Sequence, residues 1–578
     1  MDRQAWIAVT LCVLGLIGWQ VYMTTHAPPP RPAIVMPSPT PPNQASPSPS
    51  ASALASGSAL PASSPAPQPA AAYVEKTETL RNADVELRLT NRGGAISEAR
   101  LVNHAAEKGQ KVVLNAADRT PIGALIENPA APALPEFAIS PATEGGVQFS
   151  QSGAAGVSVV KRFAFAPSAE KKDNFVVEMN VEFRNESQSP YKNSGYFVTL
   201  GSAQPIHPND LPSYTRLVWC VDGKAKGTDV GWFAEQNKFF GMQKRPAQEF
   251  FQEKIGGAEW GGVSNQFFTT LISPLGAKAV EIWGKRFDVK RSDDRSVAGI
   301  EGAMAMPGFE LPAGQSTSLK FQIYAGPKLY GRLAKLDHDE AEVMNFGIWK
   351  LVSQALLNFM NLLHGFLGNY AVAIVVLTAI VKAVLWPLQN KANKSMRRMS
   401  ALSPKMQELR EKYKDDPTRM NQEVMKLYKE HGVNPVGGCL PMMIQIPIFF
   451  GLFSMLGQAV ELRNAPFLWV HDLSQPDTVA HIPGLGWPIN ILPLLMGATN
   501  VWLMRMTPKT GDTTQQKVMM FMPLIFLFFC YNFAAALALY YTTQNLFTIL
   551  QLYQNRKQPL PVLEKAAPAG KRSRKRKP

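Results

Sequence analysis

The chain has 578 residues, a formal net charge of +15 and an apolar fraction of 46%. Its length allows several domains, and its composition changes from a polar first half to a strongly apolar second half. The four cysteines, Cys12, Cys220, Cys439 and Cys530, form no CxxC pair and no metal-binding spacing, which argues against a disulfide framework. The basic residues cluster beside apolar runs, a pattern typical of membrane topology rather than nucleic-acid recognition.

The first apolar run covers residues 5–22, with Arg3 before it. A cleaved signal peptide is the alternative, but no small-x-small cleavage site follows the run. We therefore predict a retained transmembrane anchor over residues 1–26, with its amino terminus in the cytoplasm. Residues 27–72 are dominated by Pro, Ser and Ala and predict an extended linker without a core.

Residues 73–335 change to short runs in which apolar and polar residues alternate, separated by Gly, Pro and Asn. Such alternation predicts half-buried strands, and many of them together predict an antiparallel β-sandwich. Because the domain follows an outward-going anchor, we expect it outside the cytoplasm. The clearest examples are residues 85–90, 159–165, 175–185 and 319–327.

The predicted β domain shows no recognisable catalytic pattern. His104 and His207 have no Ser, Cys or Glu nearby at a catalytic spacing. Residues 337–340, Asp-His-Asp-Glu, resemble a metal cluster, but consecutive residues on a helix point in different directions. A solvated charge run is the favoured interpretation. We predict no enzyme activity, cofactor or metal.

Residues 345–364 form an amphipathic segment. It predicts a helix lying in the membrane interface, and packing of the same face against the β domain is the alternative that stays open. The apolar stripe contains Trp349, Val352, Leu356, Phe359 and Leu363, and the other face contains Lys350, Ser353, Gln354, Asn358 and Asn361.

Further apolar runs cover residues 369–388, 439–460, 489–506 and 518–553. The last is too long for one span of about 20 residues, so we split it at a turn near residues 532–535. These runs predict five spans in residues 365–556, and six with the anchor.

The charges between the spans predict their orientation. Residues 389–438 are rich in Lys and Arg, and the tail, residues 557–578, ends in KRSRKRKP, whereas residues 461–487 contain Arg463 as their one basic residue. Lys/Arg-rich loops are cytoplasmic, so both termini are predicted to be cytoplasmic.

The basic loop, residues 389–438, predicts a helical hairpin. Ser403-Pro404 and Asp416-Pro417 are helix-start signals, and Gly432 is a stop signal. Its basic faces suit solvent, anionic headgroups or ribosomal RNA, but no groove-reading motif predicts recognition of a specific nucleic-acid sequence.

Lys382 lies well inside the span of residues 369–388. A charged side chain there costs about 2.5–3.5 kcal/mol on insertion scales, and none of the five spans contains an Asp or Glu. Uncharged polar residues do occur, among them Thr378, Gln445, Asn500 and the run at residues 540–545. Each alone is ordinary helix–helix contact, but together with an unpaired cation they predict a hydrated cavity for a polar or acidic ligand.

Several long motifs carry a resemblance to a known family. They are residues 434–456 (NPVGGCLPMMIQIPIFFGLFSML), 460–474 (VELRNAPFLWVHDLS), 515–529 (QQKVMMFMPLIFLFF) and 539–545 (LYYTTQN). The chain resembles the YidC family of membrane protein insertases, in the Gram-negative form with a large periplasmic β-supersandwich. The resemblance implies a polytopic α-helical membrane protein whose five core spans surround a hydrophilic groove open to the cytoplasm and to lipid.

The family's groove positions correspond here to Thr378, Lys382, Gln445 and Tyr541, and we place Gln544 of the same polar run with them. The family more usually has Arg at the position of Lys382. This difference matters because a buried lysine, unlike an arginine, can lose its proton.

The resemblance implies insertion of nascent membrane proteins into the cell inner membrane, alone or with the Sec translocon. The implied partners are nascent chains, the ribosome and the lipid bilayer. Ribosome or nascent-chain contact is expected at Arg397, Arg398, Lys405 and Lys412. A small-solute or ion transporter is one alternative, although it would usually carry carboxylates at the midplane. An anchored periplasmic sugar-binding domain is the other.

Overall fold

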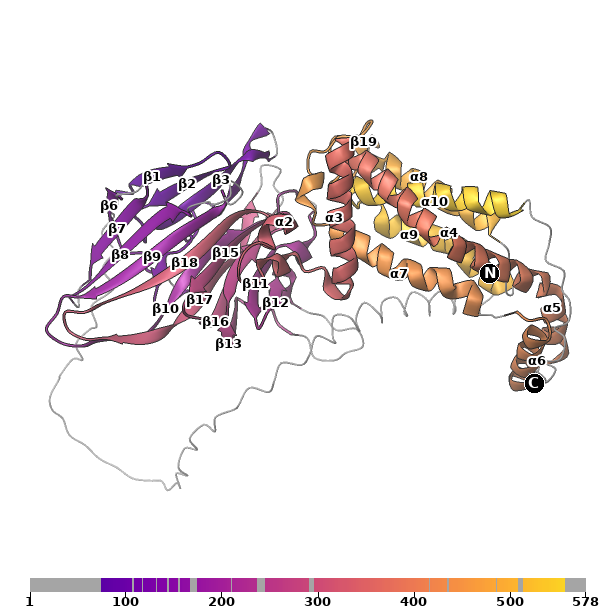
Figure 1. Cartoon of the computed structure of the whole chain (residues 1–578), viewed down its shortest axis with the longest axis horizontal. Helices are drawn as coiled ribbons and strands as arrows, with labels where there is room; N and C mark the ends of the chain where they lie inside the picture. The colour runs from indigo at the N-terminus through magenta and orange to yellow at the C-terminus, as the bar shows by residue number, and fades with distance from the viewer. Residues whose placement is uncertain are drawn as a thin grey trace, which may run out of the picture. The chain divides into compact units, whose positions relative to one another are not determined.

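A computed structural model describes residues 74–556 (Figure 1). The predicted anchor, linker and basic tail lie outside the described residues. Within 74–556 the description omits residues 107–108, 117, 131, 143–144, 154–155, 167–173, 209, 236–244, 291–295, 415, 434–435, 485 and 508–512.

The first part of the described chain is built of antiparallel strands, as the alternation predicts. Strand β2 shows the reason, since Val85, Leu87 and Leu89 are fully buried while Arg88 between them is exposed. The strands are β1 Thr77–Arg81, β2 Val85–Thr90, β3 Ala95–Ala105, β4 Lys111–Leu114, β5 Leu125–Ile126, β6 Ala138–Pro141, β7 Val147–Ser152, β8 Val157–Phe165, β9 Val176–Asn185, β10 Tyr191–Ala203, β11 Arg216–Val221, β12 Lys224–Asp229, β13 Phe250–Ala258, β14 Trp260–Ser264, β15 Phe268–Leu275, β16 Ala279–Lys290, β17 Ser296–Leu311 and β18 Ser316–Pro327.

These strands form a large β-sandwich. One sheet has the order β12-β11-β14-β15-β18-β9-β8-β7-β6, and a second has the order β13-β16-β17-β10-β5. Strands β10 and β17 of the second sheet pack on β14 of the first, over a core that includes Trp260 and Phe268. A smaller sheet, β1-β2-β3-β4, extends the domain. The predicted antiparallel sandwich is confirmed.

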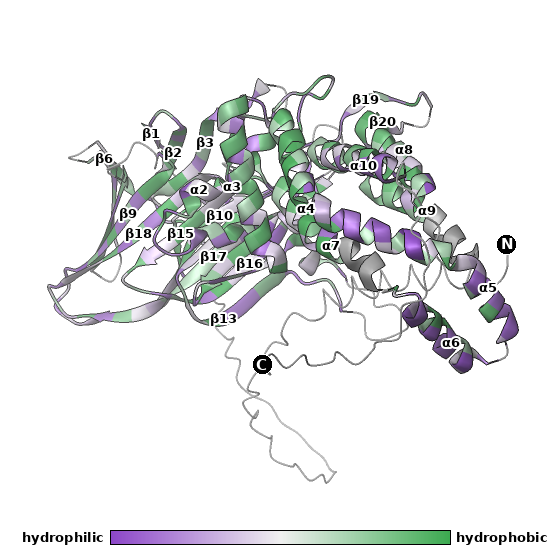
Figure 2. Cartoon of the chain, turned by 45° about the vertical axis from the view of Figure 1, so that its right-hand side comes forward, coloured by the Kyte–Doolittle hydropathy of each residue, from purple (hydrophilic) through white to green (hydrophobic). Residues whose placement is uncertain are grey.

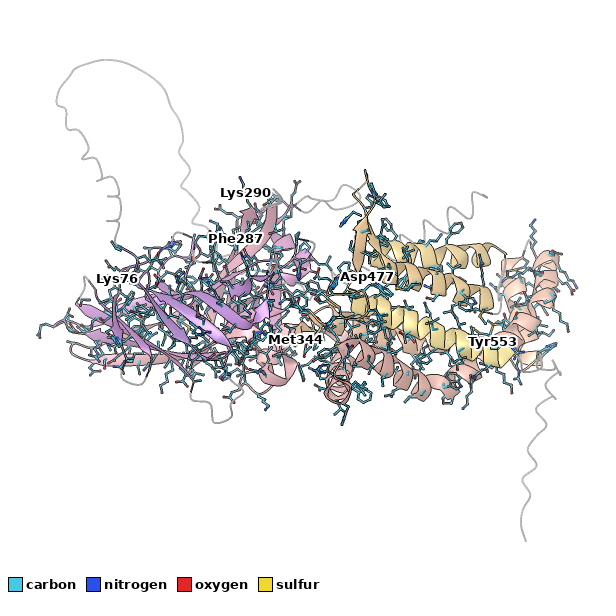
Figure 3. The ribbon with its side chains drawn as sticks, turned by 90° about the horizontal axis from the view of Figure 1, so that it is seen from above. Lys76, Phe287, Lys290, Met344, Asp477 and Tyr553 are labelled. Atoms are coloured by element: carbon cyan, nitrogen blue, oxygen red, sulfur yellow. The ribbon has the colours of Figure 1, made fainter. Side chains whose placement is uncertain are left out.

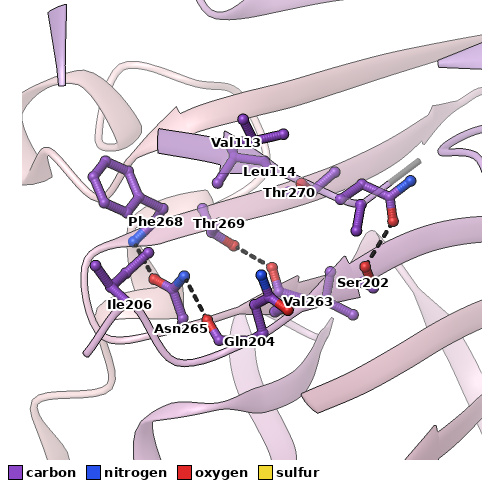
Figure 4. A pocket seen from close by; sticks show the side chains of 13 residues that line it. Val113, Leu114, Ser202, Gln204, Ile206, Val263, Asn265, Phe268, Thr269 and Thr270 are labelled. Atoms are coloured by element: carbon purple, nitrogen blue, oxygen red, sulfur yellow. Dashed lines mark hydrogen bonds between the residues drawn. The ribbon is translucent and has the colours of Figure 1, made fainter. Parts of the chain in front are cut away.

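The histidines and acidic run of the β domain have structural contacts. His104 packs edge-on against Phe268, with 5.3 Å between ring centroids, and burial lowers its pKa to about 4. Glu340 accepts hydrogen bonds from Ser273 Oγ at 3.0 Å and from the His338 backbone N–H at 2.9 Å. It therefore connects the acidic run of residues 337–340 to strand β15. The small cavity in Figure 4, about 40 Å³, is bordered by Asn265, which is bonded to the Gln204 carbonyl.

The second part of the described chain is helical. Two short strands, β19 Thr478–His481 and β20 Pro488–Asn490, pair with each other between α7 and α8. The helices are α2 Tyr330–Leu333, α3 Lys350–Leu367, α4 Tyr370–Ala401, α5 Ser403–Lys412, α6 Pro417–Glu430, α7 Val436–Leu456, α8 Ile491–Met506, α9 Thr513–Cys530 and α10 Ala535–Arg556.

Helix α4 is longer than the predicted span, which we ended at residue 388. It continues through Pro387 to Ala401, so the apolar span and the basic segment form one helix. Figure 2 shows this change along α4, from hydrophobic to hydrophilic. Pro387 has no N–H, so the Ala383 carbonyl loses its intrahelical donor. Membrane helices tolerate such a proline. Beside it, Gln551 Nε2 of α10 donates to the Trp386 carbonyl at 3.2 Å.

By length and composition, one helix of the described part, α4, can cross a membrane. Three shorter apolar helices are Met443–Leu456, Ile491–Met506 and Phe521–Cys530. The predicted split of the last apolar run is also found, because α9 ends at Cys530 and α10 begins at Ala535.

Helix α3 differs from its predicted two faces. Ser353, assigned to the polar face, is fully buried, and its Oγ donates to the Gly451 carbonyl of α7 at 2.9 Å. The helix packs on α4 and α7. A second apolar stripe is exposed on α3 and the turn before it: Ile348, Leu351, Leu362 and Phe366, with exposed fractions of 72%, 81%, 55% and 82%.

Helices α5 and α6 form the predicted hairpin and are strongly hydrophilic (Figure 2). Asp416 caps α6 by accepting from the Arg419 backbone N–H at 3.0 Å, and Gly432 adopts a left-handed conformation just after the helix. The start signal at Ser403-Pro404 is found, although Ser403 is the first residue of α5 and Leu402, not Ser403, is its N-cap. Tyr428 Oη lies 2.8 Å from Met406 Sδ and joins the two helices.

Polar contacts join the sandwich to the helices. Gln266 Nε2 donates to the Gly457 carbonyl at 2.8 Å, and the Arg463 guanidinium donates to the Ala105 carbonyl at 3.0 Å. Lys328, directly after β18, donates to Gln458 Oε1 at 3.3 Å.

Candidate functional site

Lys382 lies on α4 and faces α10. Its Nζ donates to Thr548 Oγ1 at 2.9 Å, and the Thr548 hydroxyl donates in turn to the Gln544 carbonyl at 2.8 Å. Within the described residues Lys382 has no carboxylate partner, and the α4, α7, α8, α9 and α10 sequences contain no Asp or Glu. An ammonium group has three donors. Among the described residues, Lys382 therefore has no counter-charge, and it keeps N–H donors that can bind a ligand.

A second set of polar contacts lies between α7 and α10. Gln445 Nε2 donates to Gln544 Oε1 at 3.1 Å and to Tyr540 Oη at 3.2 Å. The backbone carbonyl of Gln544 also accepts from the Thr548 hydroxyl, and that hydroxyl accepts from Lys382. The side-chain amides of Gln445 and Gln544 are therefore connected to Lys382 through α10. Three helices therefore meet in one hydrogen-bonded network.

The structure places the other two predicted groove residues outside this network. Thr378 is buried, and its hydroxyl donates to the Ile374 carbonyl of its own helix at 2.7 Å. The ring of Tyr541 packs among aromatic side chains, with centroids 5.3 Å from Phe449 and 5.1 Å from Phe526. Thr378 and Tyr541 are therefore close in sequence to the network but make packing and backbone contacts.

Closer to the carboxyl end of α4 than Lys382, the contacts between α4 and α10 are made by carboxamide side chains. Asn390 Oδ1 accepts from Gln551 Nε2 at 2.8 Å and from Asn555 Nδ2 at 3.0 Å, both on α10. Arg397 donates to the Asn555 carbonyl at 2.8 Å. Figure 3 labels Asp477 and Tyr553 near opposite ends of the helical part, and this carboxamide cluster belongs to the Tyr553 end.

The four basic residues predicted to contact a ribosome or nascent chain are not equivalent. Lys405 and Lys412 are exposed on the hairpin, and Arg398 is half-buried. Lys412 Nζ also lies 5.6 Å from the Tyr413 ring centroid. Arg397, by contrast, is engaged with α10.

Sequence reasoning missed Thr548, Asn390, Gln551 and Asn555. A signal was present, because Thr548, Gln551 and Asn555 recur at intervals of three and four residues and so share one helix face. Asn390 lies beyond residue 388, where we ended the predicted span.

The fold and the site together define a protein in which apolar helices, one of them long enough to cross a membrane, hold a polar, cationic network and carry a large β-sandwich. The family model described as 60Kd inner membrane protein matches residues 362–560, and that of the YidC periplasmic domain matches residues 78–359. This chain belongs to the YidC family of membrane protein insertases.

Two relatives support the assignment by sequence. A membrane protein insertase YidC from Syntrophus aciditrophicus (strain SB) is 31% identical over 593 residues, covering 96% of this chain and 100% of the relative. One from Nitratidesulfovibrio vulgaris (strain DSM 19637 / Miyazaki F) is 33% identical over 405 residues, 68% of each chain. A solved active YidC insertase with its first transmembrane domain resolved is 18% identical, with a TM-score of 0.34, covering 84% of this chain and 94% of that one.

Proposed function

We propose that this protein inserts nascent membrane proteins by attracting the polar or acidic tail of the substrate to Lys382. The tail then crosses only part of the hydrocarbon, while the apolar helix of the substrate moves along the spans into lipid. Burial of an apolar helix of about 20 residues drives the process, and the protein lowers the barrier. Family membership supports this activity, and no nucleotide or covalent step is needed.

The observation that carries the proposal is the bonding of Lys382 to a neutral hydroxyl in helices without carboxylates. A cation in a membrane interior is usually paired or functional. Here the substrate supplies the missing counter-charge. The network of Gln445 and Gln544 offers further groups that both donate and accept hydrogen bonds.

The proposed topology follows the family and the charge distribution. Residues 1–26 anchor the chain, residues 27–72 link it to a periplasmic domain of residues 73–335, and residues 365–556 hold five further spans. Both termini, the basic end of α4 and the hairpin of α5 and α6 face the cytoplasm. The exposed apolar stripe of α3 supports a position in the membrane interface for residues 345–364.

The hairpin and tail are the proposed contacts with a translating ribosome, through Arg398, Lys405 and Lys412. Arg397 is proposed instead to hold α4 against α10. Insertion alongside the Sec translocon is proposed from family membership.

The charge of Lys382 is tested by two substitutions in reconstituted vesicles. Lys382→Arg keeps the cation and is expected to preserve insertion of a substrate with an acidic tail. Lys382→Glu repels that tail and is expected to slow insertion by about tenfold or more, since hydrogen bonds to charged groups contribute about 1.5–3 kcal/mol. Equal insertion by the Glu variant would contradict charge attraction.

A further inference from the structure

A cavity of about 710 Å³ lies where the β-sandwich meets the helical part, at the Asp477 end of the helices (Figure 3). We call it the junction cavity. The sandwich borders it with Gln266 and the loop between β10 and β11, and the helical part borders it with the ends of α7 and α9, the start of α10 and the loop between α7 and α8. Its volume falls in the range of about 300–1,000 Å³ that is typical of ligand sites.

The wall of the junction cavity has an apolar side and a polar side. The apolar side belongs to the helix ends and consists of Phe453, Leu456, Phe529, Phe533 and Leu537. The polar side includes Asp210, Gln266, Gln475, Thr478 and His481. A wall divided in this way suits an amphipathic ligand, which has an apolar chain and a polar head.

The apolar side of the junction cavity opens to the outside of the helical part. Phe529 lines the cavity and is 66% exposed, and the adjacent Phe528 is 78% exposed. In the proposed topology the hairpin of α5 and α6 is cytoplasmic, so α7 and α9 end, and α10 begins, at the periplasmic face. Aromatic side chains are enriched at this depth, where a membrane helix meets the interface. A molecule entering past Phe529 would therefore come from the outer leaflet.

Asp210 supplies a negative charge on the polar side. Its side chain is 4% exposed, and its Oδ2 accepts from the backbone N–H groups of Ile206 at 3.0 Å and His207 at 2.9 Å. Its Oδ1 lies 3.2 Å from His207 Nδ1. The described residues that line the cavity include no lysine and no arginine. This charge distribution favours a ligand head with a cationic group over an anionic head.

Contacts between the two sides hold the junction cavity open. Gln475 Nε2 lies 2.9 Å from His207 Nδ1, and Gln266 Nε2 donates to the Gly457 carbonyl at 2.8 Å. Gly457 also leaves room for Tyr214, because a Cβ at this position would lie 2.5 Å from the Tyr214 hydroxyl oxygen. The cavity is therefore preformed. Filling it with water alone would leave its aromatic side in contact with water, which an apolar ligand avoids.

We propose that the junction cavity binds one phospholipid of the outer leaflet whose head carries a primary ammonium group, as in phosphatidylethanolamine. One acyl chain lies along Phe529 and Phe533, the ammonium group donates to Asp210, and the phosphate stays at the open rim beside His481. The site goes beyond the proposed insertase activity and takes only the topology from it. The lipid fills the space between the sandwich and the helices.

Photolabelling of the full-length protein in vesicles tests the site. The probe is a phosphatidylethanolamine with a diazirine in one acyl chain, and mass spectrometry locates the labelled residues. We expect label on Phe453 and Phe533, which line the cavity and are half-buried, as well as on Phe528, which reports ordinary contact with lipid. Label on Phe528 without label on Phe453 and Phe533 overturns the proposal.

A matched pair of variants tests whether that label comes from the cavity. Ala534 lines the cavity, so Ala534→Trp fills it and should lower the label on Phe453 and Phe533 by about fivefold or more. Ala480 is exposed on β19 and is not one of the lining residues, so Ala480→Trp should leave the label unchanged. The label on Phe528 should stay the same in both, which shows that the helices still contact lipid. Equal label on Phe453 and Phe533 in the two variants contradicts a lipid in the cavity.

The head group is tested in the wild type, without a variant that fills the cavity. The same probe is used in vesicles of unlabelled phosphatidylethanolamine and in vesicles of phosphatidylglycerol, which is anionic. We expect phosphatidylethanolamine to compete, so that the label on Phe453 and Phe533 is about fivefold lower in the first vesicles than in the second. Asp210→Asn keeps an oxygen for the two backbone N–H groups but lacks the charge, and should remove most of this difference. Equal label in both kinds of vesicle in the wild type overturns the proposal. No substrate is present, so these results do not depend on charge attraction by Lys382.

Discussion

Lys161 and Lys382 have very different surroundings. Lys161 in β8 is fully buried, and its Nζ donates to the carbonyls of Gly93 at 2.9 Å and Gly123 at 2.8 Å. The ring of Phe137 lies 5.3 Å from the same nitrogen. Lys382 has a single hydroxyl partner. Lys161 is bound by backbone carbonyls of its own domain, whereas Lys382 keeps N–H donors that can bind a substrate.

Replacing Lys161 with methionine is expected to destabilise the β-sandwich. The substitution leaves two buried carbonyls unsatisfied, at about 1–3 kcal/mol each. Urea unfolding of the full-length protein in detergent, followed by tryptophan fluorescence, measures the loss. Lys161→Arg is not a suitable control, because the larger guanidinium does not fit a fully packed core. A change below about 0.5 kcal/mol would show that the two carbonyl contacts contribute little to folding.

The same lysine predicts a dependence of stability on pH. Burial lowers the pKa of Lys161 from 10.5 to about 7. Between these values the unfolded chain binds more protons than the folded one, so folding stability rises with pH from about 7 to about 10.5. The free energy of unfolding of the wild type, minus that of Lys161→Met, should therefore increase across this window. A difference independent of pH would contradict the shift.

At the scale of single elements, α3 carries the clearest prediction. Its exposed stripe should lie in the membrane interface, where each large apolar side chain contributes about 1.5–3 kcal/mol. Leu351→Asp together with Phe366→Asp should therefore move the helix out of the interface. Quenching of a fluorophore at Ala355 by lipid-attached quenchers is expected to fall severalfold, whereas Leu351→Met together with Phe366→Met, which keeps the stripe apolar, should leave it unchanged. Unchanged quenching in the double variant would place α3 outside the interface.

The elements also show what the sequence could and could not predict. The strands, the turn before α10 and the α5–α6 hairpin follow from alternation, apolar length and Pro or Asp start signals, which are local. The continuation of α4 through Pro387 has no local signal, because proline usually ends or kinks a helix. Beyond the proline, α4 contacts α10, for example through Asn390 and Gln551. Buried Ser353 on α3 likewise depends on Gly451, about 100 residues away.

The candidate site was predictable in part for the same reason. Lys382, Gln445 and Gln544 stood out as polar residues in apolar runs, and the structure joins them in one network. Thr378 has the same sequence signal but bonds to its own backbone. Composition marks polar residues within spans, whereas the pairing of helices decides which of them meet.

At the scale of the whole molecule, Arg463 links the helical part to the β-sandwich. Its guanidinium donates to the Ala105 carbonyl and lies 5.1 Å from the Phe268 ring centroid. Arg463→Met keeps an unbranched side chain but removes the guanidinium and its N–H donors. Hydrogen exchange of residues 457–465 should become at least severalfold faster, while exchange in the distant hairpin stays the same. Unchanged exchange at 457–465 would mean that this contact does not hold the two regions together.

The central claim is that the substrate supplies the counter-charge for Lys382. It is tested most directly by a charge-exchange experiment with two substrates that differ in one tail residue, acidic or basic, and with wild type and Lys382→Glu. We predict that the wild type inserts the acidic tail faster and that Lys382→Glu inserts the basic tail faster. The ratio of the acidic-tail rate to the basic-tail rate should differ at least tenfold between the two proteins, which corresponds to a coupling free energy of about 1.4 kcal/mol or more. Two variants with the same tail preference would contradict the account.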